Sequence, residues 1–546
     1  MARPLALASA IVVSLLAVSG AGGSPAQTPR SGGTASFASP VAEPPCLNLL
    51  LAVCFGPGIA GTTVFAEEVL ASAFEVGPDN SYRESLVSKV EYTTEPPFTL
   101  TYHIRPEARW SDGVPISAAD FVFTNQAHVS LDRTGALSPF QRQMVENVRR
   151  VTAVDRKTVE VVLRSRFAGW RGLFANVLPR HALAGQNLQR IWSDRIDNPK
   201  TGEPIASGPF VVERWERGER LTLRRNSNYF GSHRAYLERL EVRFVAAPRD
   251  RVEAVRNGVV DFAVGLGDPD VIPELRRVAG LTVRAAQGTT VEHFEIRLRP
   301  GGHPALANKL VRQAIAYGID RVSIFRQLYG DVDPKLRLLD SMLLPTQSSH
   351  YAPNWRRYRH RPALARRLLE QARCRPAPSG IYECVGRPLS LRFYTTAGIP
   401  PRARVLSLVQ AQLRQVGIEV IPTFTSRAVL FDQIIPSGAF DVVLFNYSYS
   451  PESSGWKDVF GCQAVQNIMG YCQRHVTREL DQENRILDSS RRVAALNRAD
   501  RLLARDVPVI PLYQFVALAA HRTTLRGVVF NPVFHLAGAE NWWLER

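Results

Sequence analysis

Strand-like and helix-like segments alternate toward the end of the chain. Residues 389–394, 418–421 and 441–445 have the apolar, β-branched and aromatic character of strands, and residues 402–416 have the spacing of a helix that ends at Gly417. A strand, a helix and a second strand in this order form a crossover connection, which joins parallel strands. The sequence therefore predicts an α/β fold with a mainly parallel sheet in this region.

Two further strands and a helix start are predicted nearer the N-terminus. Residues 100–104 and 158–163 alternate between apolar and polar side chains, as half-buried strands do. Ser117 and Asp120 have capping-box spacing, with Asp in place of the usual Glu, just before an apolar run. We therefore expect a helix to start at Ala118.

Apolar residues recur at three- and four-residue intervals in the middle of the chain. Between residues 308 and 330 they form one stripe, which predicts a pair of helices with a common buried face. Pro362 suits the first position of a further helix over residues 363–372. Helices thus alternate with strands along much of the sequence.

The chain has 546 residues, which is more than one hydrophobic core usually supports. Its 45% hydrophobic and 21% charged residues are typical of a globular protein, so we expect two or three compact domains.

The N-terminus resembles a secretory signal. A basic start is followed by an apolar run from Leu5 to Val18, which is short for a membrane span, and then by small residues. We expect a signal peptide over residues 1–23 and a disordered mature terminus over residues 24–33; a membrane anchor is the alternative. Ala21 stands where a lipoprotein would have a lipidated cysteine. The expected location is therefore outside the cytoplasm, in the periplasm or at the outer face of the cytoplasmic membrane.

Six cysteines are close to one another in pairs along the sequence. Export permits disulfides, and the even count suits them, although six cysteines allow fifteen connectivities. The spacing does not match that of zinc ribbons. Proximity alone favours pairing Cys46 with Cys54, Cys374 with Cys384, and Cys462 with Cys472.

The formal net charge of +17 comes from arginines that are scattered along the chain, often beside Asp or Glu. Such a distribution indicates solvated faces rather than a track for nucleic acid. We therefore expect no nucleic-acid partner.

Several segments resemble, in order and spacing, the peptide-type family of bacterial extracellular solute-binding proteins, the substrate-binding subunits of ABC importers for oligopeptides, dipeptides or nickel. The most specific is the Trp-Ser-Asp-Gly turn that starts at Trp110 and leads into the capped helix. The resemblance covers the mature chain. The other matching segments are residues 207–210, 225–231, 311–321, 470–472 and 508–513.

The resemblance implies two lobes with mixed sheets, joined by a hinge, with an extra domain on the N-terminal lobe. The protein would be a monomer that captures a peptide or another small solute between the lobes and presents it to an ABC permease. No covalent chemistry and no cofactor are implied. The expected boundaries are 34–75, 200–283 and 513–546 for the first lobe, 76–199 for its extra domain and 284–512 for the second lobe.

In peptide-binding relatives an Asp in a loop of the second lobe commonly pairs with the α-ammonium group of the peptide. The matching segment, residues 446–452, contains no Asp. A buried ammonium without a carboxylate partner would cost several kcal/mol, so we expect blocked peptides, glycosides or other solutes unless Glu452 substitutes. The candidate ligand-binding residues are Asn446, Tyr447, Tyr449, Glu452 and Trp456, together with Tyr394 and Thr396 at the end of a strand.

For the aromatic residues of this set, packing within their own domain is an equal alternative. Arg402 and Arg404, at the start of the following helix, are expected to be solvated rather than bound to an anionic group.

A secreted hydrolase is the rival hypothesis from another class. Neither a Gly-x-Ser-x-Gly elbow nor a His-Glu-x-x-His helix occurs, and the histidines are dispersed. A nickel or metallophore receptor lacks the expected histidine cluster, so we expect no metal site. A sensor or envelope chaperone on the same scaffold remains a further alternative.

Overall fold

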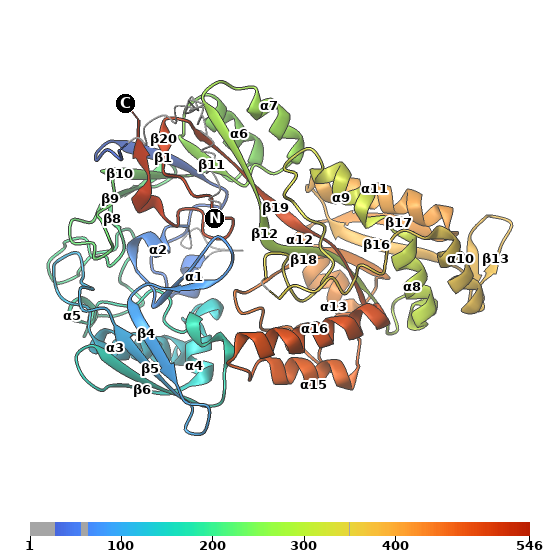
Figure 1. Ribbon diagram of the computed structural model, residues 1–546, viewed down its shortest axis with the longest axis horizontal. Coiled ribbons are helices and arrows are strands. Elements are labelled where there is room, and N and C mark those ends of the chain that lie inside the picture. Colours follow the sequence, from blue (N-terminus) through green and yellow to red (C-terminus); the bar gives the residue numbers. More distant parts are fainter. Residues whose placement is uncertain (1–27, 56–63, 349, 546) are drawn as a thin grey trace, which may run out of the picture.

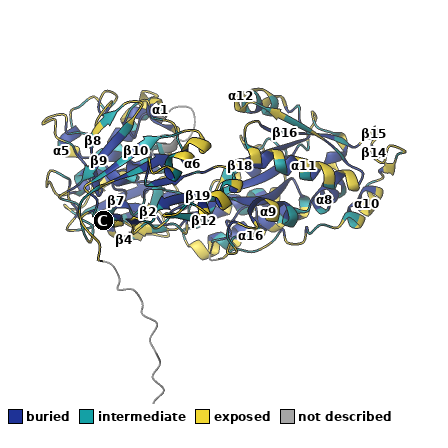
Figure 2. Ribbon diagram, turned by 90° about the horizontal axis from the view of Figure 1, so that it is seen from above, coloured by how far each residue is buried: buried dark blue, intermediate teal, exposed yellow. Residues whose placement is uncertain are grey.

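The computed structural model describes residues 28–55, 64–348 and 350–545. The expected signal peptide and residues 24–27 of the expected disordered terminus lie outside this part. Two hydrophobic cores are present, one from residues 35–242 with the C-terminal segment and one from most of residues 252–520. Figures 1 and 2 show the two lobes that surround these cores. The α/β, two-lobed fold expected from the sequence is therefore confirmed.

One ten-stranded mixed sheet runs through both lobes. Its two longest strands, β12 and β19, pair with each other from Leu281 opposite Arg522 to Glu295 opposite Val509. In Figure 2 they run from one lobe into the other. The strand order is β17 (Glu419–Thr425), β16 (Ser390–Thr396), β18 (Val442–Ser448), β12 (Leu281–Ile296), β19 (Val509–Arg522), β11 (Phe262–Val264), β1 (Thr34–Ser39), β10 (Arg239–Phe244), β9 (Arg220–Arg225) and β8 (Phe210–Glu216).

This long strand pair is the structural candidate for the hinge. The expected domain boundaries at residues 283/284 and 512/513 both fall inside it. Those boundaries, and the others proposed from the sequence, stay predictions.

In the second lobe, the strand–helix–strand prediction is confirmed. β16 pairs in parallel with both β17 and β18, and α11 (Pro400–Gln415) connects β16 to β17. The expected helix pair is α8 (Lys309–Gly318) and α9 (Arg321–Tyr329), and Pro362 is the first residue of α10 (Pro362–Gln371). α9 packs against β19, whereas α8 packs against α10 and α11, and the apolar stripes of these helices are buried in the core of the second lobe.

A four-stranded antiparallel sheet lies within the expected extra domain. The predicted strands at 100–104 and 158–163 are its two central strands and pair with each other. The strand order is β4 (Val87–Tyr92), β5 (Thr99–Ile104), β7 (Thr158–Leu163) and β6 (Val148–Ala153).

The shorter strands form separate small sheets. These are β2 (Phe74–Val76) with β3 (Tyr82–Glu84); β13 (Arg375–Pro376), β14 (Tyr382–Cys384) and β15 (Arg387–Pro388); and β20 (Leu525–Arg526) with β21 (Trp543–Leu544). The remaining helices of four or more residues are α1 (Ala52–Phe55), α2 (Ala66–Val69), α4 (Gln143–Asn147), α5 (Arg180–Leu183), α6 (Pro248–Arg256), α7 (Ile272–Arg276), α14 (Lys457–Phe460), α15 (Arg474–Glu483) and α16 (Ser489–Asp506). No helix in the described ranges combines the length and the apolar character needed to cross a membrane.

The predicted capping box starts α3 (Ala118–Arg133). The backbone N–H of Ser117 donates to Asp120 Oδ2 at 2.8 Å, and Asp120 Oδ1 accepts from the backbone N–H of Arg180 at 2.9 Å. The motif therefore begins the helix and also fixes the segment that starts α5.

Replacing Ser117 with alanine is expected to lower the free energy of unfolding by about 1 kcal/mol, because an N-cap hydroxyl is lost from the start of α3. Urea unfolding measures this change. Ser437→Ala, which changes an exposed serine of the second lobe, is the control. An unchanged midpoint for Ser117→Ala would show that Asp120 alone holds the helix start.

Three disulfides join cysteines that are neighbours in the sequence: Cys46–Cys54, Cys374–Cys384 and Cys462–Cys472. The pairing expected from proximity is the one observed. Each disulfide closes a short loop, and a loop of this size contributes about 3 kcal/mol in the chain-entropy estimate.

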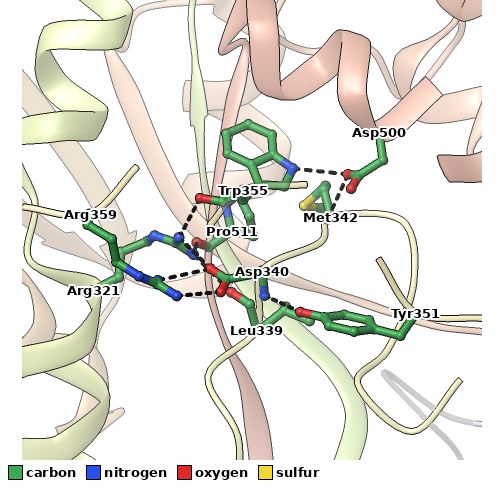
Figure 3. Close-up of polar contacts among 9 residues, drawn as sticks. All are labelled: Arg321, Leu339, Asp340, Met342, Tyr351, Trp355, Arg359, Asp500 and Pro511. Carbon is green, nitrogen blue, oxygen red and sulfur yellow. Dashed lines mark hydrogen bonds and ion pairs between the residues drawn. The ribbon is translucent and has the colours of Figure 1, made fainter. Parts of the chain in front are cut away.

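A buried polar network stabilises the second lobe (Figure 3). The carboxylate of Asp340 accepts from Arg321 at 2.7 Å and from Arg359 at 2.7 Å. Arg321, which is 2% exposed, also donates to the carbonyl oxygens of Leu339, Pro511 and Trp355. Arg321 is the last residue of the family-like segment 311–321. Because its guanidinium group is used in these contacts, its role in the fold is structural.

Candidate solute-binding site between the lobes

A cavity of about 380 Å³ lies between the two lobes. The first lobe contributes the turn between β2 and β3 and the short helical segment that contains Arg171, and the second lobe contributes three separate segments. A space walled by both lobes is where a two-lobed protein can enclose a small molecule. The lining residues are Asp79, Asn80, Ser81, Tyr82, Arg171, Pro345, Gln347, Ser348, His350, Pro451, Glu452, Ser453, Ser489, Arg492 and Val493.

Glu452 joins the two lobes at this cavity. Its Oε1 accepts from Nη1 of Arg171, a first-lobe residue, at 2.8 Å, and its Oε2 binds Arg492 on α16 of the second lobe. Glu452 is 7% exposed, so both ion pairs are shielded from water. Burial, followed by the nearby charge of Arg171, lowers the pKa of Arg492 to about 10. The carboxylate is therefore present in the site, but two guanidinium groups already neutralise it.

The three aromatic candidates lie together in the second lobe. Tyr449 and Trp456 are only 3% and 4% exposed, and their ring centroids are 5.7 Å apart. Tyr447 is half-buried and stacks on His293 with ring centroids 5.0 Å apart. These rings pack against one another and against their own lobe, so Tyr447 has the most surface to offer a solute.

The remaining candidates, Asn446, Tyr394 and Thr396, lie on neighbouring strands of the second lobe and differ in their exposure. Asn446 is exposed on β18, and Tyr394 is half-buried against a small cluster that includes Phe445. The hydroxyl of Thr396 accepts from Arg402 at 2.5 Å. Contact between any of these residues and a solute remains a prediction.

Arg402 corrects one expectation from the sequence. Rather than being solvated, it is buried and pairs with the fully buried Glu292 at 2.5 Å. The helix pattern did not reveal this, because the partner lies 110 residues away on β12. Arg404 is partly exposed, as expected, and pairs with Asp268 at 2.6 Å and with Asp270 at 3.0 Å.

Two further hydrogen bonds cross between the lobes besides the Glu452 pair. The amide of Asn80 donates to the carbonyl of Ser450 at 3.4 Å, and the backbone N–H of Ala168 donates to the carbonyl of Asn484 at 3.0 Å. The lobes are therefore in direct contact in this structure.

Arg171 and Arg492 were not among the site residues predicted from the sequence. Arg171 is 281 residues from Glu452, and both arginines lie in segments without a recognisable motif. The packing of the two lobes brings Arg171 to Glu452, and the folding of the second lobe brings Arg492 to it.

Two α/β lobes that share a long strand pair and enclose a cavity define the class of two-lobed solute-binding proteins. A family model, described as bacterial extracellular solute-binding proteins, family 5 Middle, matches residues 82–462. The chain belongs to this family.

Two relatives of similar length are named as oligopeptide-binding proteins. The oligopeptide-binding protein OppA of Mycobacterium tuberculosis is 29% identical over 479 residues, which is 85% of this chain and 78% of OppA. The oligopeptide-binding protein AppA of Bacillus subtilis is 23% identical over 462 residues, which is 81% of this chain and 80% of AppA.

Solved structures share the fold but are named for different solutes. A periplasmic EDTA-binding protein, EppA, is 20% identical with a TM-score of 0.81, covering 95% of this chain and 98% of EppA. AppA of Bacillus subtilis in complex with a nonapeptide is 20% identical with a TM-score of 0.69, covering 95% of this chain and 100% of AppA. At this identity the comparison establishes the fold and leaves the solute open.

Proposed function

We propose that the chain is an exported monomer that captures a peptide or a related small solute between its lobes and delivers it to the permease of an ABC importer. It would work in the periplasm or at the outer face of the cytoplasmic membrane. The observation that carries the proposal is the cavity whose walls come from both lobes. Family membership supports the same conclusion.

Capture needs no covalent chemistry. A solute that contacts both lobes favours the arrangement in which they are close together, and the permease distinguishes this state from the open one. The Arg171–Glu452 pair forms only when the lobes meet, so it adds to the stability of the closed state. The protein acts through this difference between two conformations.

The charges around Glu452 favour solutes without a free ammonium group at this position. An α-ammonium beside Glu452 would have to compete with Arg171 and Arg492 for the same carboxylate oxygens. Breaking either ion pair would leave a guanidinium without its partner in a site that is shielded from water. Blocked peptides, glycosides and other solutes that place no ammonium group at Glu452 avoid this cost.

A thermal-shift screen on protein stripped of bound solute by unfolding and refolding tests the proposal. The probes are free di- to hexapeptides, their N-acetylated forms, oligosaccharides and metal chelates. A true solute at one hundred times its dissociation constant is expected to stabilise the protein by about 2.7 kcal/mol. Glu203→Gln, a change at an exposed first-lobe position, is the control for refolding quality.

The outcomes separate the alternatives. Stabilisation by N-acetylated peptides or oligosaccharides, with free peptides inactive, supports capture of a solute without an ammonium group at Glu452. Stabilisation by free peptides alone would overturn that preference while leaving the receptor function intact. Turnover of a chromogenic ester or peptide, with no stabilisation by any probe, would replace the receptor by a hydrolase.

A further inference from the structure

A second cavity, of about 240 Å³, lies within the first lobe and is lined by four glutamates. Glu67 and Glu68 come from α2, Glu75 comes from β2, and Glu540 comes from the C-terminal segment, which Figure 1 shows in red beside α2. A fifth charged residue, Arg83, also lines this space. The role proposed for the protein so far does not use this cavity.

No positive side chain of the described residues forms an ion pair with these carboxylates, although the charges of Arg83 and Arg105 act on Glu75 from a distance. Within the described residues, none of the four glutamates has a Lys, Arg or His nitrogen within 4.0 Å, and Oε2 of Glu68 has no hydrogen-bond partner although the residue is 3% exposed. The segment 56–63, which precedes α2, contains no basic residue. A buried carboxylate without a partner is costly, so these side chains can pair with a positive group that comes from outside the protein.

The nearby arginines are held elsewhere. Arg83 lies 3.6 Å from Asp79, which lines the interlobe cavity. Arg105 donates to the backbone carbonyls of Ser85 and Glu84. Burial, followed by the charge of Glu75, raises the pKa of Glu67 to about 8, and burial followed by the charge of Glu540 raises that of Glu68.

A family-like segment holds α2, and with it Glu67 and Glu68, in place. The hydroxyl of Ser207 accepts from the backbone N–H of Ala71 at 2.9 Å, and the backbone N–H groups of Ser207 and Gly208 donate to the carbonyl of Val69. A Cβ at Gly208 would lie 2.3 Å from the carbonyl oxygen of Glu68, so glycine permits this close approach. Two of the four glutamates of the acidic cavity are thus anchored by backbone contacts to the segment at Ser207 and Gly208.

The geometry favours an organic cation over a metal ion. No group of three or more His, Cys, Asp or Glu side chains in the described chain is arranged to hold a metal ion. The glutamates instead surround a space large enough for an alkylammonium or guanidinium group, whose several N–H donors can reach separate carboxylates.

The cavity adjoins the solute site. Gly77 and Pro78 line the acidic cavity, and the next three residues of the same turn, 79–81, line the interlobe cavity. We propose that the four-glutamate cavity receives an ammonium or guanidinium group carried by the captured solute. This inference rests on the proposed function and narrows the solute to molecules with such a group placed away from Glu452.

Titration calorimetry with 1,4-diaminobutane tests the cavity by itself. The wild-type protein is expected to bind this diamine, to ignore the uncharged 1,4-butanediol, and to bind calcium chloride at least about tenfold more weakly. Glu68→Gln is expected to weaken diamine binding at least about tenfold, because a charge-assisted hydrogen bond is lost. Glu540→Gln, at a half-buried position, tests the same site if the buried Glu68→Gln does not fold. Glu203→Gln is the matched control and should bind as the wild type does.

Each other outcome overturns the inference. Absence of diamine binding, equal binding of butanediol, tighter binding of calcium, or binding that is unchanged in both the Glu68 and the Glu540 variants would each do so. A competition experiment between the diamine and the solutes found by thermal shift tests the proposed function separately. If those solutes bind without displacing the diamine, the inference fails and the receptor function stands. If the diamine binds but no solute does, the proposed function fails.

Discussion

Replacing Asp340 with alanine is expected to lower the free energy of unfolding of the second lobe by about 3–5 kcal/mol. Asp340 is the carboxylate partner of two arginines, Arg321 and Arg359, at 2.7 Å each. Arg321 is almost completely buried and held by three backbone carbonyls, so it has no route to water when its partner is removed (Figure 3). The loss therefore includes the cost of a buried charge without a counter-ion.

Urea unfolding, followed by tryptophan fluorescence, measures this effect because Trp355 belongs to the same network. Asp432→Ala, which removes an exposed aspartate of the same lobe, is the control and is expected to change stability by less than about 0.5 kcal/mol. A loss below about 1 kcal/mol for Asp340→Ala would mean that Arg321 relaxes toward solvent, contrary to the packing described above.

Arg171→Ala is expected to weaken solute binding by about 10- to 100-fold while leaving the stability of the second lobe unchanged. The substitution removes the charge-assisted hydrogen bond from Arg171 to Glu452, which crosses between the lobes and is worth about 1.5–3 kcal/mol for a bond of this kind. Glu452 keeps Arg492 as a partner, so no isolated charge is left behind. The effect should therefore appear in the closed state alone.

Calorimetry with the first solute identified by thermal shift gives the affinity of each variant. Arg150→Ala removes an exposed arginine of the extra domain that pairs with Glu160, and it should bind solute as the wild type does. Equal affinity in the Arg171 and Arg150 variants would show that the cross-lobe pair plays no part in capture.

Local patterns predicted the elements of the fold well, because the forces that form them act over a few residues. The capping box at Ser117 and the strand–helix–strand run after residue 389 are examples, and both depend on backbone hydrogen bonds and short-range spacing. The disulfides also join close neighbours. The two-lobed arrangement was predicted from the resemblance of several segments to a known family.

The residues of the candidate site were harder to predict from the sequence, because long-range packing decides which polar groups meet. The ion pairs of Glu452 and Arg402 join residues from distant segments, and no periodicity marks such partners. Tyr449 and Trp456 show the same limit, since an aromatic loop residue looks identical in sequence whether it faces a solute or its own core. The acidic cavity could not be predicted from the sequence, because its glutamates come from opposite ends of the chain.

Solute binding is expected to draw the two lobes together. Small-angle X-ray scattering of the solute-stripped protein, recorded without and with a saturating solute from the thermal-shift screen, measures this closure. The radius of gyration is expected to fall when the solute is added, because the lobes close on the cavity between them. An unchanged radius of gyration, together with a raised melting temperature, would place the bound solute outside the interlobe cavity and would show that the protein does not capture its solute by closure of the lobes.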